Sequence, residues 1–288
     1  MIRKCAFAKI NLFLDVLDKR PDGYHNIKSV MQSISLHDKI SLEVDNCIDN
    51  RIAIKCDNPK ILCDSSNLIY KAWERFCSAT GIKNKKCTFV VEKNIPVSAG
   101  LAGGSSDCAC ALKLLNEAFA FPLSNKQLLD LGSKIGADVA FCLKGGTCIC
   151  EGIGEKLTPI KGISDVYMVC AIGDASVSTP VAFSLLDAKY GTDCKESRDI
   201  SNIVNALEGQ VLNFVAMFLY NKFESVISPL YDEIDEIKSI MDSNGAIGTL
   251  MSGSGPSVFG IFNSRKCQED AFSALKNKGI SAFLCKTI

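Results

Sequence analysis

A glycine-rich segment, Pro96–Asp107, holds the residues whose types and spacing best suit chemistry. Gly100, Gly103 and Gly104 lack the Cβ atoms that would keep a polyanion away from the backbone. The segment runs into a predicted helix over Cys108–Phe119, so its backbone N–H groups and the helix dipole would favour a phosphate. A simple loop that leads into a capped helix explains the same pattern, and both interpretations stay open.

Two familiar phosphate-binding loops are excluded. The sequence contains no G-x-x-x-x-G-K-[ST] pattern, so the chain is not a P-loop NTPase. A second glycine-rich segment, Ser252–Pro256, places Val258 where a dinucleotide-binding fingerprint needs its third glycine. A Rossmann interpretation therefore fails.

Three further positions combine polar groups with apolar surroundings. Lys9 and Asn11 lie on the same face of a predicted strand over Ala6–Val16, where they either face solvent or point into a site. A turn over Lys19–His25, built by Pro-Asp-Gly, presents an aromatic ring and an imidazole. Asp138 follows a predicted helix in an apolar neighbourhood, where it is either an N-cap or a partly desolvated base with a cationic partner.

The length and composition of the chain indicate a globular protein with two domains. Its length of 288 residues is long for one core, and we place the boundary between residues 1–160 and 161–288. Lys+Arg and Asp+Glu both total 32, so the net charge indicates neither nucleic acid nor an anionic membrane as a partner. The start of the chain lacks the apolar core of a secretory signal, and no stretch of about 18 apolar residues predicts a membrane span.

Cysteine is abundant, with 15 residues, but only two histidines accompany it and no paired C-x-x-C motif occurs. This pattern does not favour a zinc or iron–sulfur site. We expect reduced thiols that pack as small hydrophobic groups, in a cytoplasmic protein.

The remaining patterns predict strands and helices in a mixture typical of an α+β sandwich, with a sheet covered by helices. Predicted strands cover residues 29–36, 39–44, 51–56, 88–92, 147–151, 166–172, 247–252, 257–262 and 282–286. Predicted helices cover residues 68–79, 124–134, 181–188, 200–207, 212–218, 231–243 and 268–278. The polar segment 194–199 is predicted to be a surface loop.

Three separated segments resemble motifs of one family, the GHMP kinases. Pro96–Ala109 resembles their phosphate-binding motif, and Gly248–Phe259 is similar to their C-terminal glycine motif. The resemblance implies a two-domain GHMP-kinase-like fold, with an N-terminal domain like the second domain of ribosomal protein S5 and a C-terminal ferredoxin-like α/β sandwich. It implies ATP and Mg²⁺ as cofactors.

Within this family, the opening of the chain is close to the branch that phosphorylates the 2-hydroxyl of 4-diphosphocytidyl-2-C-methyl-D-erythritol. The match covers Ala8–Leu14 and Arg20–His25, and it extends to Lys93-x-Ile95-Pro96, Gly136–Val139 and Ser178–Pro180. The implied partner is a small molecule, a cytidine diphosphate-linked methylerythritol, with no nucleic acid and no membrane. We expect a monomer or a weak homodimer.

The resemblance assigns roles residue by residue. Asp138 matches the general base, and Lys9 matches the cation beside it. The substrate-binding positions are Asn11 near the hydroxyl, Tyr24 and Phe183 on the two faces of the cytosine, His25 at its edge, and Thr179 near the methylerythritol or diphosphate end. The nucleotide-binding positions are Asn67 and Lys93 near the adenine, with Pro96, Gly100, Leu101, Ala102, Gly103, Gly104, Ser105 and Ser106 around the phosphates. Ser106 is also a candidate contact for Mg²⁺.

Two positions depart from the family pattern. Ala102 stands where a third consecutive glycine is usual, and Cys108 stands where alanine is usual. If position 102 requires a positive φ, the alanine should weaken nucleotide binding. The alternatives are another GHMP small-molecule kinase, acting on homoserine or a mevalonate derivative, or a catalytically silent nucleotide-binding relative.

Overall fold

The computed structural model describes residues 1–173, 177–192 and 197–288. These residues form two compact units. Unit 1 comprises Met1–Ala8, His37–Val97 and Ala102–Gly145, and unit 2 comprises Lys9–Leu36, Ser98–Leu101 and Gly146–Ile288. Two long strands, β1 (Ile2–Lys19) and β2 (His25–Asn46), contribute residues to both units. The domain boundary near residue 160 stays a prediction, and residues 194–196 of the predicted polar loop lie outside the described residues.

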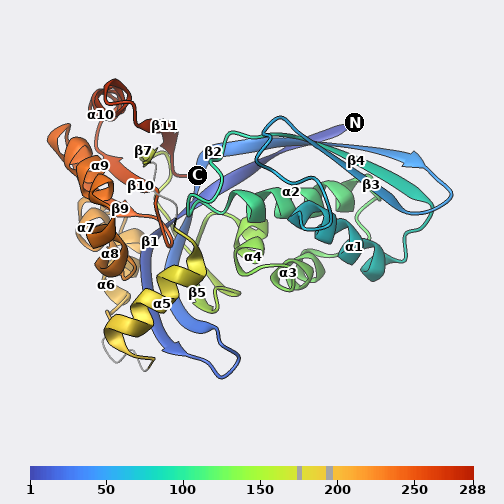
Figure 1. Cartoon of the computed structure of the whole chain (residues 1–288), viewed down its shortest axis with the longest axis horizontal. Helices are drawn as coiled ribbons and strands as arrows, with labels where there is room; N and C mark the ends of the chain where they lie inside the picture. Colours follow the sequence, from blue (N-terminus) through green and yellow to red (C-terminus); the bar gives the residue numbers. More distant parts are fainter. Residues whose placement is uncertain (174–176, 193–196) are drawn as a thin grey trace. The chain divides into compact units, whose positions relative to one another are not determined.

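Unit 1 packs helices against one end of a sheet. Its strands are β3 (Arg51–Cys56), β4 (Lys85–Glu92) and the second half of β2, and its helices are α1 (Leu68–Thr80), α2 (Gly103–Ala118), α3 (Asn125–Ser133) and α4 (Ala137–Lys144). Strand β4 pairs antiparallel with the second half of β2 and parallel with β3. Figure 1 shows the four helices gathered on one face of these strands.

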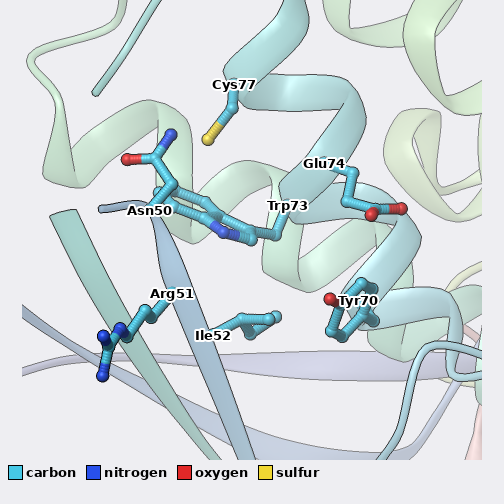
Figure 2. Close-up of a pocket in the computed structure, with 7 residues that line it drawn as sticks. All are labelled: Asn50, Arg51, Ile52, Tyr70, Trp73, Glu74 and Cys77. Carbon is cyan, nitrogen blue, oxygen red and sulfur yellow. The ribbon is translucent and has the colours of Figure 1, made fainter. Parts of the chain in front are cut away.

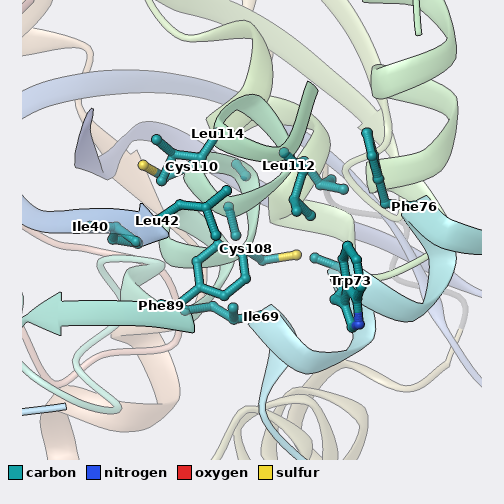
Figure 3. Close-up of a cluster of buried hydrophobic side chains, with 14 of the residues drawn as sticks. Ile40, Leu42, Ile69, Trp73, Phe76, Phe89, Cys108, Cys110, Leu112 and Leu114 are labelled. Carbon is teal, nitrogen blue, oxygen red and sulfur yellow. The ribbon is translucent and has the colours of Figure 1, made fainter. Parts of the chain in front are cut away.

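The core of unit 1 lies between that sheet and the helices. Side chains from β2, β4, α1 and α2 meet there, as Figure 3 shows. Phe76, Phe89 and Leu112 have no exposed surface, and the indole of Trp73 is only 3% exposed. Each large apolar side chain buried in this way contributes about 1.5–3 kcal/mol to folding. The core therefore anchors α2, whose first turn carries the glycine-rich segment.

Local signals explain where the helices of unit 1 begin and end. Asn67 caps α1 by accepting a hydrogen bond from Ile69 N, and Gly81 ends the helix in the left-handed conformation. Ser124 and Gln127 form a reciprocal capping box at the start of α3. These helices match their predicted ranges to within one or two residues.

Unit 2 contains a four-stranded sheet and a smaller group of strands. The sheet has the order β11-β7-β10-β9, with antiparallel neighbours: β7 (Tyr167–Ile172), β9 (Ala246–Met251), β10 (Val258–Phe262) and β11 (Ser281–Lys286). Helices α9 (Asp232–Ser243) and α10 (Arg265–Asn277) cover it (Figure 1). The other elements are β5 (Thr147–Gly152), β6 (Lys156–Ile160), β8 (Tyr220–Asn221), α5 (Thr179–Tyr190), α6 (Ser201–Glu208), α7 (Leu212–Met217) and α8 (Glu224–Ile227).

Three predicted features are wrong in detail. Strand β2 is continuous, although a break was predicted at His37-Asp38, because the buried Asp38 carboxylate binds neighbouring backbone amides instead of forming a turn. Helix α2 begins at Gly103, earlier than the predicted Cys108. Helix α4 was not predicted, and Asp138 lies in its first turn, with Gly136 as the N-cap. Among the described residues, no helix is both long and apolar enough to cross a membrane.

Candidate active site

The N-terminus of α2 presents unpaired backbone donors in unit 1. The amide of Ser106 donates to Ala102 O at 2.8 Å. In the described part of the chain, the amides of Gly103, Gly104 and Ser105 donate to no protein group. The first N–H groups of a helix have no partner inside it, and the helix dipole adds positive potential at the same end. This geometry suits the oxygen atoms of a phosphate.

Close packing explains the glycine at position 103. A Cβ atom there would lie 3.1 Å from Ile95 Cγ2 and 3.3 Å from Lys93 Nζ, so a larger residue would push the loop away. Ala102, the N-cap residue, adopts the left-handed conformation with φ of 59° and makes no side-chain capping hydrogen bond. The positive φ considered for this position is therefore present, and the alanine carries backbone strain that a glycine would not.

Lys93 lies between two buried carboxylates. Its Nζ donates to Asp107 Oδ2 at 2.8 Å and to Asp38 Oδ2. Asp38 also accepts hydrogen bonds from the amides of Asn94 and Ile95, at 2.5 and 2.7 Å. The Lys93 side chain is 3% exposed, so its ammonium holds the segment that precedes the glycine-rich loop. The predicted contact of Lys93 with the adenine stays a prediction.

One ammonium cannot neutralise both carboxylates of this cluster. Asp38 has three donors, whereas Asp107 has only Lys93, and its Oδ1 atom is buried without a hydrogen-bond partner. Burial, which outweighs the attraction of Lys93 and is reinforced by the Asp38 charge, raises the pKa of Asp107 to about 8. Asp107 therefore keeps a proton over much of the neutral range.

Asn67, the other residue assigned to the adenine, uses both ends of its amide in local structure. Its Oδ1 accepts from Ile69 N at 2.9 Å, and its Nδ2 donates to Leu62 O at 2.7 Å. Asn67 therefore fixes the start of α1. A hydrogen bond from its side chain to a base would have to be made in addition to these two bonds or in place of one of them.

Asp138 is the second residue of α4 and is partly buried. Acidic side chains are common in the first turn of a helix, so the position of Asp138 also has a purely structural explanation. The sequence placed Asp138 just past a helix, and the structure adds that a second helix begins there. This placement leaves the predicted base untested.

In unit 2, Lys9 and Asn11 share one face of β1, as their spacing predicts. Lys9 Nζ donates to Asn11 Oδ1 at 2.8 Å and to Gly100 O at 3.2 Å. Asn11 Nδ2 donates to Ser29 Oγ at 2.8 Å. The side chains of Lys9 and Asn11 are buried, and the Lys9 amide also bonds to Leu101 O. The hydrogen bonds fix the direction of the ammonium group.

The turn at Gly253 supports the same ammonium group. A Cβ atom on Gly253 would lie 3.5 Å from Lys9 Nζ and 3.2 Å from Gly100 O, and a Cβ atom on Gly100 would overlap Ser252 O. Ser252 Oγ donates to Gly100 O at 3.1 Å. Asn221 Nδ2 donates to Gly253 O at 2.8 Å, and this hydrogen bond helps to fix the turn. The glycines therefore allow the turn to approach the backbone of Gly100, whose carbonyl oxygen accepts a hydrogen bond from Lys9.

The residues assigned to cytosine lie in unit 2. The rings of His25 and Phe183 stack on one another, with centroids 4.6 Å apart and an angle of 11° between their planes. Tyr24 is 61% exposed. The imidazole of His25 covers one face of Phe183, so a base could stack on that face only by displacing the imidazole. Tyr24 and Phe183 therefore do not form a preformed site with space for a base between their rings.

Thr179 begins α5 and is exposed, and its Oγ1 lies 3.0 Å from Ser254 Oγ. This hydrogen bond joins the predicted substrate-binding threonine to the C-terminal glycine turn. Inside unit 2, Thr179 is thus bonded to the glycine turn, Lys9 lies close to Gly253 of the same turn, and Asn11 is bonded to Lys9.

The predicted Mg²⁺ contact does not fit. Ser106 is 2% exposed, and its Oγ donates to Phe7 O at 2.6 Å, so the hydroxyl serves to hold α2 to β1. Within residues 1–173, 177–192 and 197–288, no cluster of His, Cys, Asp and Glu has the form of a metal site. No residue is therefore assigned to a metal.

A cavity of about 500 Å³ lies between α1 and β3 of unit 1. Figure 2 shows its lining, which comprises Asn50, Arg51, Ile52, Tyr70, Trp73, Glu74 and Cys77. None of the predicted site residues is among them. The indole of Trp73 is nearly fully buried, so it forms the floor of the cavity and belongs to the core.

Sequence reasoning missed several residues of the site. Asp38 and Asp187 were overlooked because single carboxylates in apolar or helical segments carry no motif. Ser252 and Ser254 were visible only as part of the C-terminal glycine motif. Asp187 bonds to His25 Nε2, and the N-terminal turn that contains His25 gave no signal for a partner 162 residues later.

The comparisons with known families match both halves of the chain. The model of the GHMP kinase N-terminal domain matches residues 67–146, and the model of the GHMP kinase C-terminal domain matches residues 201–281. The chain is 42% identical to 4-diphosphocytidyl-2-C-methyl-D-erythritol kinase of Clostridium botulinum, over 98% of this chain and 99% of that protein. It is 43% identical to the kinase of the same name from Caldicellulosiruptor bescii, over 90% and 89%.

Solved structures share the fold of the chain. A crystal structure of 4-(cytidine 5'-diphospho)-2C-methyl-D-erythritol kinase matches with a TM-score of 0.82 and 28% identity, over 99% of both chains. Homoserine kinase from Cytophaga hutchinsonii shares the fold, with a TM-score of 0.74 and 17% identity over 97% of this chain and 94% of that one. These findings confirm the predicted mixed α+β fold, and the chain belongs to the GHMP kinase family.

Proposed function

We propose that the chain is an ATP-dependent kinase that phosphorylates the 2-hydroxyl of 4-diphosphocytidyl-2-C-methyl-D-erythritol, a step of the non-mevalonate route to isoprenoids. The observation that carries this proposal is the similarity of about 40% identity, over nearly the whole chain, to kinases named for that substrate. Membership of the GHMP kinases establishes a small-molecule kinase with an alcohol acceptor and implies the use of ATP.

Phosphoryl transfer depends on positioning and charge neutralisation more than on covalent chemistry. The acceptor is a tertiary alcohol and a very weak acid, so its proton must leave as the new P–O bond forms. We assign the removal of this proton to the Asp138 carboxylate and the stabilisation of the developing alkoxide to the Lys9 ammonium. General base help of this kind is typically worth 10²–10⁴-fold, about 3–5 kcal/mol. Asn11, bonded to Lys9, would orient the hydroxyl.

The nucleotide phosphates are assigned to the N-terminus of α2. The amides of Gly103, Gly104 and Ser105 are the supporting observation, because within the described residues they have no protein partner. Pre-oriented backbone donors stabilise the charge of the transferring group without reorganisation. Mg²⁺, which would neutralise phosphate charge when bound, is proposed without a protein ligand.

The cytosine of the acceptor is assigned to Tyr24, His25 and Phe183. A base bonded in the plane of the imidazole would lie parallel to the Phe183 ring, because the two rings are within 11° of parallel. Base–aromatic stacking is worth roughly 1–3 kcal/mol per base. Thr179, held by Ser254, would bind nearer the methylerythritol or diphosphate end.

The test is an ADP-release assay with purified chain, ATP and Mg²⁺, run with three acceptors: 4-diphosphocytidyl-2-C-methyl-D-erythritol, homoserine and mevalonate. Phosphorus NMR of the product then shows whether a new phosphomonoester forms. We expect turnover of the first acceptor at least a hundredfold faster than of the others. Preferential turnover of homoserine or mevalonate would contradict the substrate, and turnover of none with intact ATP binding would indicate a silent relative.

A monomeric or weakly dimeric state and a cytoplasmic location stay predictions. Light scattering of the purified chain across its concentration range measures the first, because a weak dimer would dissociate on dilution.

A further inference from the structure

Two residues of α5 fix the ring of His25. Phe183 stacks on the imidazole at 4.6 Å, and Asp187 Oδ1 lies 2.8 Å from His25 Nε2. Phe183 and Asp187 are four residues apart, so they project from the same face of the helix. The ring of Phe223 packs against Phe183 in a T-shaped contact, with centroids 5.0 Å apart and an angle of 82° between the planes, and this contact helps to hold Phe183 in place. The imidazole can therefore neither tilt nor rotate freely.

The Asp187 carboxylate acts only as an acceptor towards this ring. Lys19 Nζ bonds to its other oxygen, Oδ2, at 2.6 Å, so each carboxylate oxygen has one donor. Although partial burial opposes ionisation, the hydrogen bonds from Lys19 and His25, together with the Lys19 charge, hold the pKa of Asp187 below its ordinary value. An ionised carboxylate has no proton to donate, so the proton of the hydrogen bond belongs to His25 Nε2.

This assignment determines the role of the other ring nitrogen. In a neutral imidazole whose Nε2 carries the proton, Nδ1 carries a lone pair and can only accept a hydrogen bond. Within the described residues, Nδ1 has no hydrogen-bond partner, and it is not among the buried atoms that lack one. It is therefore an acceptor available to a ligand.

We propose that Asp187, through His25, selects cytosine over uracil in the acceptor, which rests on the proposed function. The exocyclic N4 amine of cytosine donates a hydrogen bond, whereas uracil has the O4 carbonyl at the same position. An acceptor at Nδ1 bonds to the amine and repels the carbonyl. Asp187 is a positioning residue, because it acts by fixing the tautomer and orientation of His25.

Asp187→Asn provides a sharp test because Lys19 constrains the new amide. The amide oxygen would face the Lys19 ammonium, so the amide nitrogen would donate to His25 Nε2 and move the ring proton to Nδ1. Nδ1 would become a donor that suits uracil. The experiment measures kcat/KM for the cytosine acceptor and for its uracil analogue, made by deamination. Asp270→Asn, at an exposed ion pair with Lys266 on α10, is the matched control.

The wild-type chain should prefer the cytosine acceptor by roughly ten- to a hundredfold, the discrimination expected of one good base contact. Asp187→Asn should lose at least tenfold of this preference, through KM for the acceptor and with KM for ATP unchanged, and Asp270→Asn should keep it. An unchanged preference in Asp187→Asn, or equal losses on both acceptors, would overturn the proposal.

A measurement without substrate separates this inference from the proposed function. The chain has only two histidines, so ¹⁵N NMR of the imidazoles at a pH where they are neutral gives two ring systems, and His37→Gln assigns them. We expect the Nε2–H tautomer at His25 in the wild type and the Nδ1–H tautomer in Asp187→Asn. The same tautomer in both proteins would refute the positioning role even if neither acceptor were phosphorylated.

Discussion

Asp138 and Lys9 carry the two charges on which the proposed transfer depends. Asp138 lies in the first turn of α4, and Lys9 is oriented by Asn11 and by Gly100 O. The sequence could indicate both residues only through motif resemblance, because a lysine in a strand and an aspartate after a helix are common. The hydrogen bonds around Lys9 depend on the fold and could not be read from the chain.

Replacement of Asp138 by Asn should lower kcat at least a hundredfold with little change in the affinity for ATP. The amide keeps the size of the side chain but cannot take up the proton of the acceptor hydroxyl. Steady-state kinetics and ATP binding by calorimetry measure the two effects. Asp130→Asn, at an exposed position of α3, is the control and should behave as the wild type. A loss of less than tenfold in Asp138→Asn would remove the base from the mechanism.

Replacement of Ala102 by Gly should raise the free energy of unfolding, because it removes backbone strain that the folded chain carries. The alanine holds φ at 59°, which costs about 1–2 kcal/mol for an L-residue, while glycine costs roughly 0.4–1 kcal/mol in chain entropy. The net gain of up to about 1.6 kcal/mol should raise the melting temperature and leave the dissociation constant of ATP nearly unchanged, because the strain is the same with and without nucleotide.

Ala120→Gly is a matched control for this change, because Ala120 has φ of 60° at the other end of the helix. It should raise the melting temperature without affecting ATP binding. If Ala102→Gly weakens ATP binding, the alanine contributes to the shape of the loop and is not simply strained.

At the scale of elements, most of the fold could be predicted from short-range signals. Asn67, Ser124 and Gly81 mark helix ends in the sequence as clearly as in the structure. Strand β2 could not be predicted as one element, because His37-Asp38 resembles a turn and becomes part of the strand only through the partners of Asp38. Helix α4 was missed because Gly136 and the short apolar run resembled a loop and strand.

The cluster of Lys93, Asp38 and Asp107 should make the stability of the chain depend on pH. The folded state holds a proton on Asp107 up to a pKa of about 8, whereas the unfolded chain releases it near pH 4. The folded state therefore binds more protons between these values, so the contribution of Asp107 to stability is greatest below about pH 4 and falls as the pH rises towards 8. The slope from one group is at most about 1.4 kcal/mol per pH unit.

Asp107→Asn should remove most of this slope, because the amide does not titrate. Urea unfolding of the wild type and the variant between pH 5 and pH 9 measures it, and Asp270→Asn should keep the wild-type slope. Parallel curves for the wild type and Asp107→Asn would show that Asp107 is ionised throughout and that Lys93 neutralises the cluster.

At the scale of the whole molecule, burial determines the chemistry of the cysteines. The 14 described cysteines form no disulfide with one another, and the reduced state of the thiols stays a prediction. Burial raises the pKa of Cys87, Cys108 and Cys110 to about 12, and those thiols cannot supply the reactive thiolate. Cys5 and Cys63 are exposed.

Iodoacetamide at neutral pH should therefore label Cys5 and Cys63 before the other 12 described cysteines in the native chain, and all 15 cysteines after unfolding in urea. Peptide mass spectrometry at increasing times gives the order of labelling. Labelling of Cys108 at the rate of Cys63 would show that α2 opens readily, and this would contradict the tightly packed core around it.

The first 46 residues, which contain β1 and β2, are divided between the two units. Unit 2 takes Lys9, Asn11, Tyr24 and His25 from the beginning of the chain, although most of its residues come after position 145. A hybrid gene that joined this chain to a paralogous kinase near its midpoint would therefore mix the parents within one unit. Such a hybrid would take the residues at positions 9, 11, 24 and 25 from one parent and those at positions 179, 183 and 187 from the other. Because the proposed acceptor site draws on both sets, the hybrid should keep the acceptor preference of neither parent.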